Sequence, residues 1–393
     1  MLSVSEALGA IRAACPAPRG SAHPLSAELE GRVLLADVTA TVSVPPFATS
    51  AMDGYAVRAA ELGGRPVPVA FRIAAGDAPR VLEPGTAAAI ATGGPVPEGA
   101  DSVVPIEDAR EEAGALTAER PRPGAAIRPA GGDLVAGDVV ARRGTLLRPA
   151  VIGAIAASGV DRAEVADRPR IAIVATGSEL VPPGTALAPG QIYESNAVAV
   201  AAQALRAGAE VVGAEVVEDD PEATRLAFAR ALADADLVVS SGGVSVGPHD
   251  YVKPALEQLG VREVFWRVRH KPGKPLWFGA APDGTLVFGL PGNPVSSVVC
   301  FELFVRAAIE TMTGAEPTPR PVARLAAPVA RLGERDHAVR CALEPGEDGM
   351  RLRPQTAQDS HLIAHAAAAD ALALIAAGTG QAAAGELVEY LPL

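Results

Sequence analysis

In the stretch Asp236-Leu-Val-Val-Ser-Ser-Gly-Gly-Val-Ser-Val-Gly-Pro-His-Asp-Tyr-Val-Lys253, a short apolar run ends at a pair of glycines. The run from Leu237 to Ser241 has the length and the β-branched composition of a buried strand. A loop with few side chains lets backbone N–H groups converge on an anion, and Ser245 adds a hydroxyl donor. Asp250 then begins a helical pattern. The plain alternative is a tight turn at Gly242-Gly243 with Asp250 as a helix N-cap.

The sequence on either side of this stretch alternates strands and helices. Ile171 to Thr176 and Val211 to Val217 have the pattern of strands, Ser195-Asn196 caps a helix that extends to about Ala207, and Asp220-Pro221 begins another helix. Such alternation predicts a doubly wound parallel sheet with helices on both faces. Ligands bind beyond the carboxyl ends of the strands in such sheets. The residues at these ends are Thr176, Glu179, Asp219, Asp220, Gly242, Gly243 and Asp250.

Two further loops are predicted to reach the same edge of the sheet. His270 to Pro275 holds Lys271 and Lys274 on a stretch stiffened by prolines, which suits an oxyanion, although a solvated basic turn is the plain alternative. Leu286 to Pro294 has the pattern of a strand, a tight turn and a helix start. Asn293 is the expected cap of that helix, which extends to about Thr313 and carries Ser296 and Ser297 in its first turn.

The N-terminal third contains helical patterns around a predicted small β-domain. We expect helices over residues 3–15, 27–38 and 148–159, the first capped by Ser3 or Ser5. Between them, strand-length runs broken by glycine and proline appear at Val67 to Ile73, Ala87 to Thr92 and Ser102 to Ile106. Three turns in this region carry a polar side chain at or near their tip: Asp53, Thr92 and Asp133. A carboxylate such as that of Asp53 also fills an ordinary Asx-turn.

The predicted fold is therefore multidomain α/β plus β. We expect a discontinuous, helical N-terminal domain (1–43 and 138–168), an inserted β-domain (44–137), a central doubly wound parallel α/β domain (169–315) and a small C-terminal β-barrel or sandwich (316–393). His361 and His365 in the last domain have the spacing of a zinc pair if helical. Since no third ligand accompanies them, an ordinary surface position is the better prediction.

Composition excludes several classes of function. The formal net charge is −12 over 393 residues and no Lys/Arg block is present, so a nucleic-acid partner is not expected. Cys15, Cys300 and Cys341 are far apart, which argues against a disulfide framework or a structural zinc site. The N-terminus lacks the pattern of a signal peptide and no apolar run approaches membrane-spanning length. The cytoplasm is the expected compartment, with no membrane partner.

Six segments, in collinear order over nearly the whole chain, resemble motifs of the molybdopterin molybdenumtransferases, the MoeA and gephyrin E-domain family. They are Pro46 to Ala56 (PFATSAMDGYA), Thr176 to Leu180 (TGSEL), Ile192 to Asn196 (IYESN), Ser240 to Gly247 (SSGGVSVG), Lys271 to Pro275 (KPGKP) and Leu290 to Pro294 (LPGNP). The resemblance implies an elongated homodimer of four-domain subunits in which the N-terminal domain mediates dimerisation and the site lies between subunits. It also implies a reaction in which molybdate is inserted into adenylylated molybdopterin with a divalent cation such as Mg²⁺, releasing AMP.

The resemblance further implies roles for individual residues. The pterin phosphate and adenylate would contact Thr92, Thr176, Gly242, Gly243, Ser245, Pro291, Gly292 and Asn293. Molybdate would contact Lys271, Lys274, Ser296, Arg340 and Ser360. Asp250, Asp53, Glu179 and Asp133 would be catalytic carboxylates, and Asp219, Asp220 and Asp250 would ligate the metal. Asp53, Thr92 and Asp133 would come from the partner subunit.

The sequence departs from the family pattern at some positions. Ala48-Thr49 stands where many members carry Asp-Asn, Ala130 to Asp133 replaces a more charged run, and the match around Ser360 is loose. No adenylyltransferase domain is present, so another protein would supply the adenylylated substrate. Two alternatives remain: a scaffold protein, which some animal members of the family are at synapses, and a pterin- or nucleotide-hydrolysing relative that shares only the glycine-rich domain.

Overall fold

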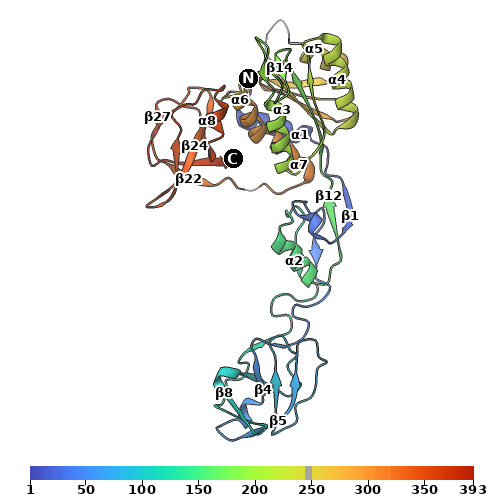
Figure 1. Ribbon diagram of the computed structural model, residues 1–393, viewed down its shortest axis with the longest axis vertical. Coiled ribbons are helices and arrows are strands. Elements are labelled where there is room, and N and C mark those ends of the chain that lie inside the picture. Colours follow the sequence, from blue (N-terminus) through green and yellow to red (C-terminus); the bar gives the residue numbers. More distant parts are fainter. Residues whose placement is uncertain (244–249, 318) are drawn as a thin grey trace. The chain divides into compact units, whose positions relative to one another are not determined.

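The computed structural model describes residues 1–243, 250–317 and 319–393. The chain divides into two compact units (Figure 1). The larger unit comprises Met1–Ser21, Gly31–Leu35 and Val165–Leu393, and the smaller unit comprises Ala22–Glu30 and Ala36–Glu164. The larger unit contains the Gly242 turn and two separate sheets, one flanked by helices and the other closed on itself.

A six-stranded sheet forms the centre of the larger unit, in the order β16-β13-β17-β21-β20-β18. Its strands are β13 (Arg170–Thr176), β16 (Glu210–Val217), β17 (Leu237–Ser241), β18 (Arg262–Trp266), β20 (Trp277–Ala280) and β21 (Leu286–Leu290). The pairings among β16, β13, β17 and β21 are parallel, as predicted, but β20 is antiparallel to both of its neighbours. The prediction that all strands of this sheet are parallel is therefore wrong. The connections on both sides of β20 are too short for the crossover that parallel pairing requires.

Helices cover both faces of this sheet, which confirms the doubly wound arrangement (Figure 1). Ile171 and Ile173 of β13 point to one face, whereas Ala172 and Val174 point to the other, as the two-residue period of a strand requires. The first face packs against α1 (Val4–Ala14), α3 (Asn196–Arg206), α6 (Pro294–Cys300), a π-helical turn η4 (Phe301–Val305) and α7 (Arg306–Thr313). The second face packs against α4 (Pro221–Asp234) and α5 (Val252–Gln258).

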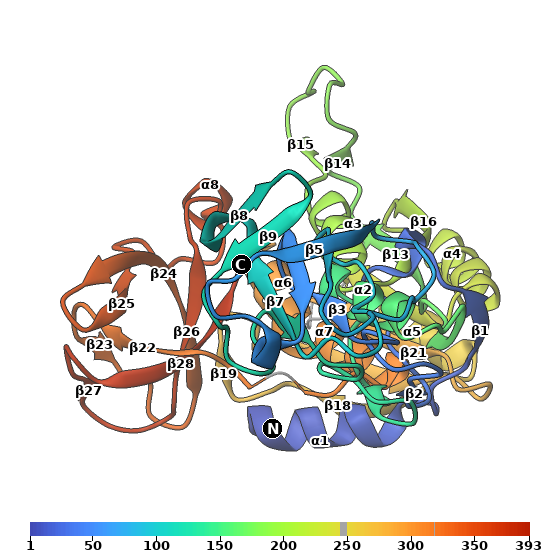
Figure 2. The same ribbon diagram turned by 90° about the horizontal axis from the view of Figure 1, so that it is seen from below.

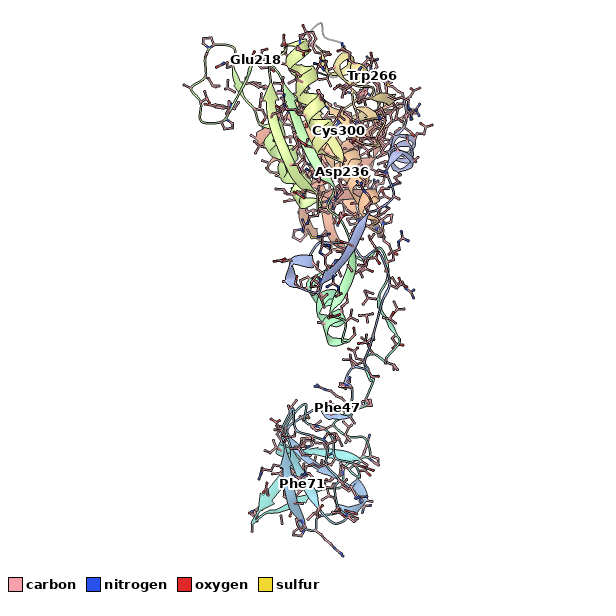
Figure 3. The ribbon with its side chains drawn as sticks, turned by 90° about the vertical axis from the view of Figure 1, so that its right-hand side faces the viewer. Phe47, Phe71, Glu218, Asp236, Trp266 and Cys300 are labelled. Carbon is pink, nitrogen blue, oxygen red and sulfur yellow. The ribbon has the colours of Figure 1, made fainter. Side chains whose placement is uncertain are left out.

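The helix starts follow from local sequence, with one exception. Ser3 caps α1 in a capping box with Glu6, and Asp220 caps α4 with Pro221 at its first position. Helix α5 begins at Val252 with Tyr251 at the N-cap position, so the alternative that made Asp250 the cap is wrong. A two-stranded ribbon, β14 (Leu180–Val181) with β15 (Ile192–Tyr193), leaves the sheet beyond β13, and the loop between them extends away from the rest of the unit (Figures 2 and 3).

The predicted helical N-terminal domain is not evident. Helix α1 buries Ala7, Leu8 and Ile11 in the core beside the central sheet and therefore belongs to the larger unit. The helix expected over residues 27–38 is wrong, because only a 3₁₀ turn, η1 (Ala27–Leu29), forms there. Gly31 follows with a φ of +75°, a left-handed conformation that ends helical propagation.

The C-terminal domain is a closed β-barrel. Of the two forms predicted for it, barrel and sandwich, the barrel is therefore correct. Strand β24 pairs with β25 and β26, β25 with β22, and β28 with both β22 and β26, so the ring has no free edge. The bounds are β22 (Val322–Leu325), β24 (Asp336–Gly346), β25 (Gly349–Pro354), β26 (Ala371–Ile375) and β28 (Leu387–Pro392). Strand β19 (His270–Lys271) adds to β24, a short ladder joins β23 (Val329–Ala330) to β27 (Gln381–Ala382), and α8 spans Ile363–Ala366.

The smaller unit contains the expected β-domain, a six-stranded sheet in the order β7-β4-β6-β5-β9-β8. Its strands are β4 (Gly54–Val57), β5 (Val67–Ile73), β6 (Ala87–Ile90), β7 (Ser102–Pro105), β8 (Ala109–Glu112) and β9 (Ala115–Ala118), with 3₁₀ turns η2 (Ala59–Glu61) and η3 (Ile106–Asp108). Short ladders join β2 (Val38–Thr39) to β11 (Val139–Ala141) and β3 (Thr49–Ser50) to β10 (Ile127–Arg128). A further ladder, β1 (Gly20–Pro24) with β12 (Arg162–Ala166), lies where the chain passes from one unit to the other. Helix α2 (Pro149–Ala157) begins with proline, as predicted.

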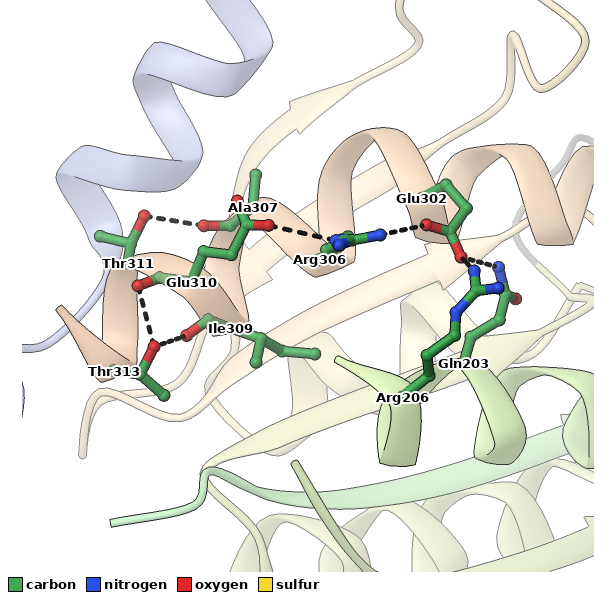
Figure 4. Close-up of polar contacts among 9 residues, drawn as sticks. All are labelled: Gln203, Arg206, Glu302, Arg306, Ala307, Ile309, Glu310, Thr311 and Thr313. Atoms are coloured by element: carbon green, nitrogen blue, oxygen red, sulfur yellow. Dashed lines mark hydrogen bonds and ion pairs between the residues drawn. The ribbon is translucent and has the colours of Figure 1, made fainter. Parts of the chain in front are cut away.

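A buried carboxylate connects α3 to the long helix formed by α6, η4 and α7 (Figure 4). Glu302 lies on the π-helical turn, and its side chain is 1% exposed. It accepts hydrogen bonds from Gln203 Nε2 at 2.8 Å, from Arg306 at 3.1 Å and from the guanidinium of Arg206. Gln203 also donates to the carbonyl of Val298 at 3.1 Å. The last turn of α3 is therefore fixed against the end of α6 and the π-helical turn.

No helix within the described ranges is both long enough and apolar enough to cross a membrane.

We expect Glu302→Ala to lower the free energy of unfolding by about 2 kcal/mol, because the change removes the shared acceptor of three donors from a buried site. Urea denaturation followed by circular dichroism measures this. Glu310→Ala is the matched control, since Glu310 also pairs with Arg306 but is 46% exposed; its effect should stay below about 0.5 kcal/mol. Equal losses for the two variants would contradict a special contribution of the buried carboxylate.

Candidate functional site

A cavity of about 300 Å³ opens at the carboxyl ends of β13 and β17. Its walls come from the ends of these strands, the β14–β15 ribbon, the start of α3 and the turn before α6. This is the edge at which the sequence predicted a ligand. The predicted residues that line it are Thr176, Glu179, Asp219, Gly242, Gly243, Asp250 and Gly292.

The glycine pair at the end of β17 is required by close packing. Gly242 and Gly243 have φ values of +90° and +65°. A Cβ added to Gly243 would lie 2.4 Å from a methyl carbon of Val252, and one added to Gly242 would lie 2.8 Å from the carbonyl oxygen of Thr176. No other residue type fits either position without movement of the backbone. Ser245, predicted to contact the same ligand, lies outside the described residues.

The acidic residues at this edge have different roles. Asp219 accepts a hydrogen bond from the backbone N–H of Ser178 at 3.2 Å, and Ser178 Oγ accepts from the N–H of Asp219 at 3.0 Å. Asp220 is not among the cavity residues; its carboxylate caps α4 by accepting from the N–H groups of Glu222 and Ala223 at 3.0 and 2.8 Å. Asp219, Asp250 and Glu179 line the cavity. Of the three predicted metal ligands, Asp219, Asp220 and Asp250, only Asp220 is used as a helix cap instead.

The geometry limits what kind of metal this edge can hold. Within residues 1–243, 250–317 and 319–393, no group of three or more His, Cys, Asp or Glu side chains is arranged to hold a metal ion. Mg²⁺ does not need such a cage, because it usually binds through one or two carboxylates together with substrate phosphates and water. The carboxylates of Asp219 and Asp250 on the wall of one cavity fit that requirement.

Asn196 and Glu194 also line the cavity. The sequence analysis assigned Glu194 no role and predicted Ser195-Asn196 as a helix cap, but Ser195 occupies the N-cap position and makes no side-chain cap. Asn196 Nδ2 donates to Ser241 Oγ at 2.8 Å and to the carbonyl of Gly292 at 2.7 Å, which joins the start of α3 to two other walls. Glu194 accepts from the N–H of Ala197 at 2.6 Å and is 4% exposed. Their position at the start of a helix, beyond a strand, was the available signal. Thr176 Oγ1 is buried and has no hydrogen-bond partner within residues 1–243, 250–317 and 319–393, so its hydroxyl is available to a ligand.

The barrel reaches the start of α6 through Ser360. Asn293 Nδ2 donates to Ser360 Oγ at 3.0 Å, and the N–H of Val295 donates to the carbonyl of Ser360 at 3.1 Å. Asn293 therefore occupies the N-cap position but makes no side-chain cap. Arg340, which is 1% exposed, donates to the carbonyls of Ala357 at 2.6 Å and Asp359 at 3.3 Å. It holds the loop that carries Ser360, and burial lowers its pKa because the charged form is poorly solvated.

Lys271 and Lys274 lie in the connection between β18 and β20, at the same edge of the sheet as the cavity. No ion pair within the described parts of the chain includes either residue. Lys271 stands in register with His337 on β24, where burial first and the charge of Lys271 second lower the pKa of His337 to about 4. Ser296 and Ser297, 3% and 0% exposed, lie in the first turn of α6. The Ser297 hydroxyl, which had no predicted role, has no hydrogen-bond partner in the described part of the chain.

Three predicted residues belong to the smaller unit. Asp53 is exposed, and its Oδ1 accepts from the backbone N–H of Thr92 at 2.6 Å and from Thr92 Oγ1 at 2.9 Å. These two hydrogen bonds lower the pKa of Asp53. Thr92, predicted to contact substrate, therefore also orients a carboxylate. Asp133 is exposed on a bend. His361 and His365 are exposed as well, in agreement with the prediction that they are surface residues.

Three family models match consecutive parts of the chain. The MoeA N-terminal region (domain I and II) matches residues 2–159, a probable molybdopterin binding domain matches residues 172–311, and the MoeA C-terminal region (domain IV) matches residues 322–393. The matches leave only short connecting segments uncovered.

Curated relatives carry one name. The chain is 41% identical over 335 residues to molybdopterin molybdenumtransferase 2 of Mycobacterium tuberculosis, covering 82% of each chain. It is 35% identical over 325 residues to molybdopterin molybdenumtransferase of Haemophilus influenzae, covering 82% of this chain and 80% of the relative. A solved structure of the molybdopterin biosynthesis MoeA protein of Pyrococcus horikoshii has a TM-score of 0.80 at 30% identity and covers 100% of this chain and 99% of its own.

We expect Thr92→Val to raise the pKa of Asp53 toward its ordinary value, because the change removes the hydroxyl donor and keeps the backbone donor. The hydrogen bonds stabilise the folded state above the unfolded pKa of Asp53, and that contribution is lost as the pH falls through the lower, folded pKa. Carboxyl-carbon NMR titration measures the shift. Thr86→Val is the control, since the Thr86 hydroxyl donates to the Glu83 carbonyl. An unchanged Asp53 pKa in Thr92→Val would show that the hydroxyl has no role.

Proposed function

The chain belongs to the MoeA family, and from this membership we propose that it is a molybdopterin molybdenumtransferase. In the proposed reaction, molybdate is inserted into adenylylated molybdopterin, AMP is released, and molybdenum cofactor is formed. The observation that carries the proposal is the division of charge along one sheet edge. Glu179, Asp219 and Asp250 line the cavity at one end, and Lys271 and Lys274 lie in a loop toward the other.

We assign the glycine side of the cavity to the pterin phosphate and adenylate. The turn at Gly242 and Gly243 carries no side chains, so a phosphate can approach its backbone closely, while the Gly242 N–H itself donates to the carbonyl of Leu290 at 3.2 Å. The orphaned hydroxyl of Thr176 supplies a further hydrogen bond from the end of β13. Gly292, with Pro291 and Asn293 on either side, forms the opposite wall. Ser245 is assigned to the same ligand from its sequence motif alone.

The divalent cation is proposed to be Mg²⁺, held by Asp219 and Asp250 together with substrate oxygens. Such an ion would neutralise negative charge on the phosphate group from which AMP is released. Asp220 contributes by capping α4 and so fixes the neighbouring backbone of Asp219. Glu179, on the cavity wall, is proposed to handle protons during release of AMP.

The molybdate is proposed to bind Lys271, Lys274 and Ser296, because an oxyanion requires cations without competing carboxylate partners. Ser360 is proposed as a further molybdate contact, because its hydroxyl accepts a hydrogen bond from Asn293 at the start of the helix that carries Ser296. Arg340 supports this side from within, since its guanidinium is engaged with the loop that leads to Ser360. Its role is therefore positioning.

The remaining assignments concern the assembly. We propose a homodimer of four-domain subunits in which Asp53, Thr92 and Asp133 of the partner subunit complete the site, with Asp53 held ionised by Thr92. A separate adenylyltransferase would supply the substrate in the cytoplasm. The family descriptions, which name domains I, II and IV around a molybdopterin binding domain, support this layout.

The purified protein, adenylylated molybdopterin, molybdate and Mg²⁺ form the deciding assay. We expect AMP release that depends on molybdate, together with a pterin product that contains molybdenum. No AMP release above background would remove the enzyme function and favour a scaffold. Release of AMP without molybdenum in the product would favour a hydrolase.

We expect Asp250→Ala to abolish this turnover and to leave the melting temperature within a few degrees of that of the parent protein. Its carboxylate is at the cavity, and α5 is capped at Tyr251. Asp234→Ala is the matched control, because Asp234 is exposed at the end of α4, before the opposite edge of the sheet. A fall in melting temperature of ten degrees or more in Asp250→Ala would make Asp250 a structural residue.

A further inference from the structure

A second group of cations lies at the edge of the sheet that contains the cavity. Strand β18 is antiparallel to β20, and β20 is antiparallel to β21, so β18 runs in the same direction as β21 and β17. Its last residue, Trp266, therefore lies at the carboxyl edge. Figure 3 shows Trp266 toward the same end of the larger unit as Glu218, which follows β16, and away from Asp236, which precedes β17.

Two cations share the indole ring of Trp266. Lys253 Nζ lies 3.0 Å from the ring centroid, and the guanidinium carbon of Arg267 lies 3.9 Å from it. The two charges are thus within about 7 Å of each other, less than the Debye length at physiological ionic strength. No ion pair among the described residues includes Lys253 or Arg267. The ring fixes their positions, and their mutual repulsion is only partly offset.

The backbone at Arg267 is in a conformation that glycine, not arginine, prefers. Its φ is +72°, in the left-handed region. A long, unbranched side chain gains nothing from this conformation, and the strain must be offset by what the side chain does. Beside it, Trp266 Nε1 is buried and has no hydrogen-bond partner among the described residues. Strain and an unsatisfied donor in adjacent residues mark this corner as a site and not as ordinary surface.

The charges around Lys253 act in both directions. Burial, the largest effect, lowers the pKa of Lys253 and Arg267 also lowers it, whereas Glu263, Asp250 and Glu257 act to raise it. Glu263 is already engaged with Trp277 Nε1 at 2.6 Å. A phosphoryl group offers several oxygens to a planar guanidinium and an ammonium at once, which a ligand with a single acceptor atom does not. Both cations lie against the indole, which leaves less of the ring for a stacked base.

We propose that Lys253, Trp266 and Arg267 form a second anion-binding subsite, which takes a phosphoryl group at the end of the sheet edge beyond the lysine loop. Lys253 and Arg267 contact the anion, and Trp266 positions them. The subsite is separate from the cavity assigned to the two linked phosphoryl groups of the adenylylated pterin, because β17 and β18 are separated by β21 and β20. Its anion-binding chemistry stands on the geometry alone.

Arg267→Gly separates a binding role from a structural one. Glycine accommodates the positive φ, so we expect the melting temperature to stay the same or rise. Inorganic pyrophosphate serves as the probe in isothermal titration calorimetry of the full chain. We expect Arg267→Gly and Lys253→Met each to weaken pyrophosphate binding about tenfold or more, because each removes a charge-assisted contact. Arg262→Gln is the control, since Arg262 is exposed at the other end of the same strand; its affinity should not change.

Two results would overturn the subsite. The first is a parent protein that does not bind pyrophosphate, or variants that bind it as well as the parent. The second is an Arg267→Gly variant that melts at a markedly lower temperature without loss of affinity, since the stacked side chain would then be structural. The probe does not require molybdate transfer. Weakened binding in the variants of a protein that transfers no molybdenum would therefore refute the proposed function and leave the subsite standing.

Discussion

The close packing of the Gly242-Gly243 turn against Thr176 and Val252 is the constraint on which the site depends. Since no Cβ fits at either glycine, β17 ends in bare backbone at the point where β13 and β21 also end. Parallel strands bring segments distant in sequence to one edge, and the turn keeps that edge open to a ligand. Asn196 then fixes the opening, because its amide bonds both the end of β17 and the turn before α6.

Charge is distributed along this edge in a way that suits a ligand with more than one anionic group. Carboxylates line the cavity beside β13 and β17, whereas Lys253, Arg267, Lys271 and Lys274 gather toward β18 and β20. The antiparallel reversal at β20 produces this division, since it places the basic connection between β18 and β20 at the carboxyl edge. Under the proposed function, the carboxylates would serve the metal and the lysines the oxyanion, without competition for the same side chains.

Local signals made much of this predictable from the sequence. Capping residues located α1 and α4, and alternating strands and helices located β13, β16 and β17 with the cavity at their ends. The C-terminal barrel was predicted, but features that depend on tertiary contacts were missed: the direction of β20, strand β26 and the π-helical turn around Glu302. The prediction of a helix over residues 27–38 was wrong because it relied on the apolar pattern and gave too little weight to Gly31, which ends the helical turn. Side-chain pairs such as Asn293 with Ser360 have no signal in a single sequence.

The double contact of Ser360 has a dynamic consequence. Its hydroxyl and its carbonyl are both engaged by the first residues of α6, so the barrel cannot swing away from the central sheet without exposing the amide of Val295 to solvent. Movement of the barrel away from the sheet and local opening at the start of the helix that bears Ser296 are therefore expected to be one event with one opening free energy. The deuterium exchange rate of that single amide reports how often the two modules part.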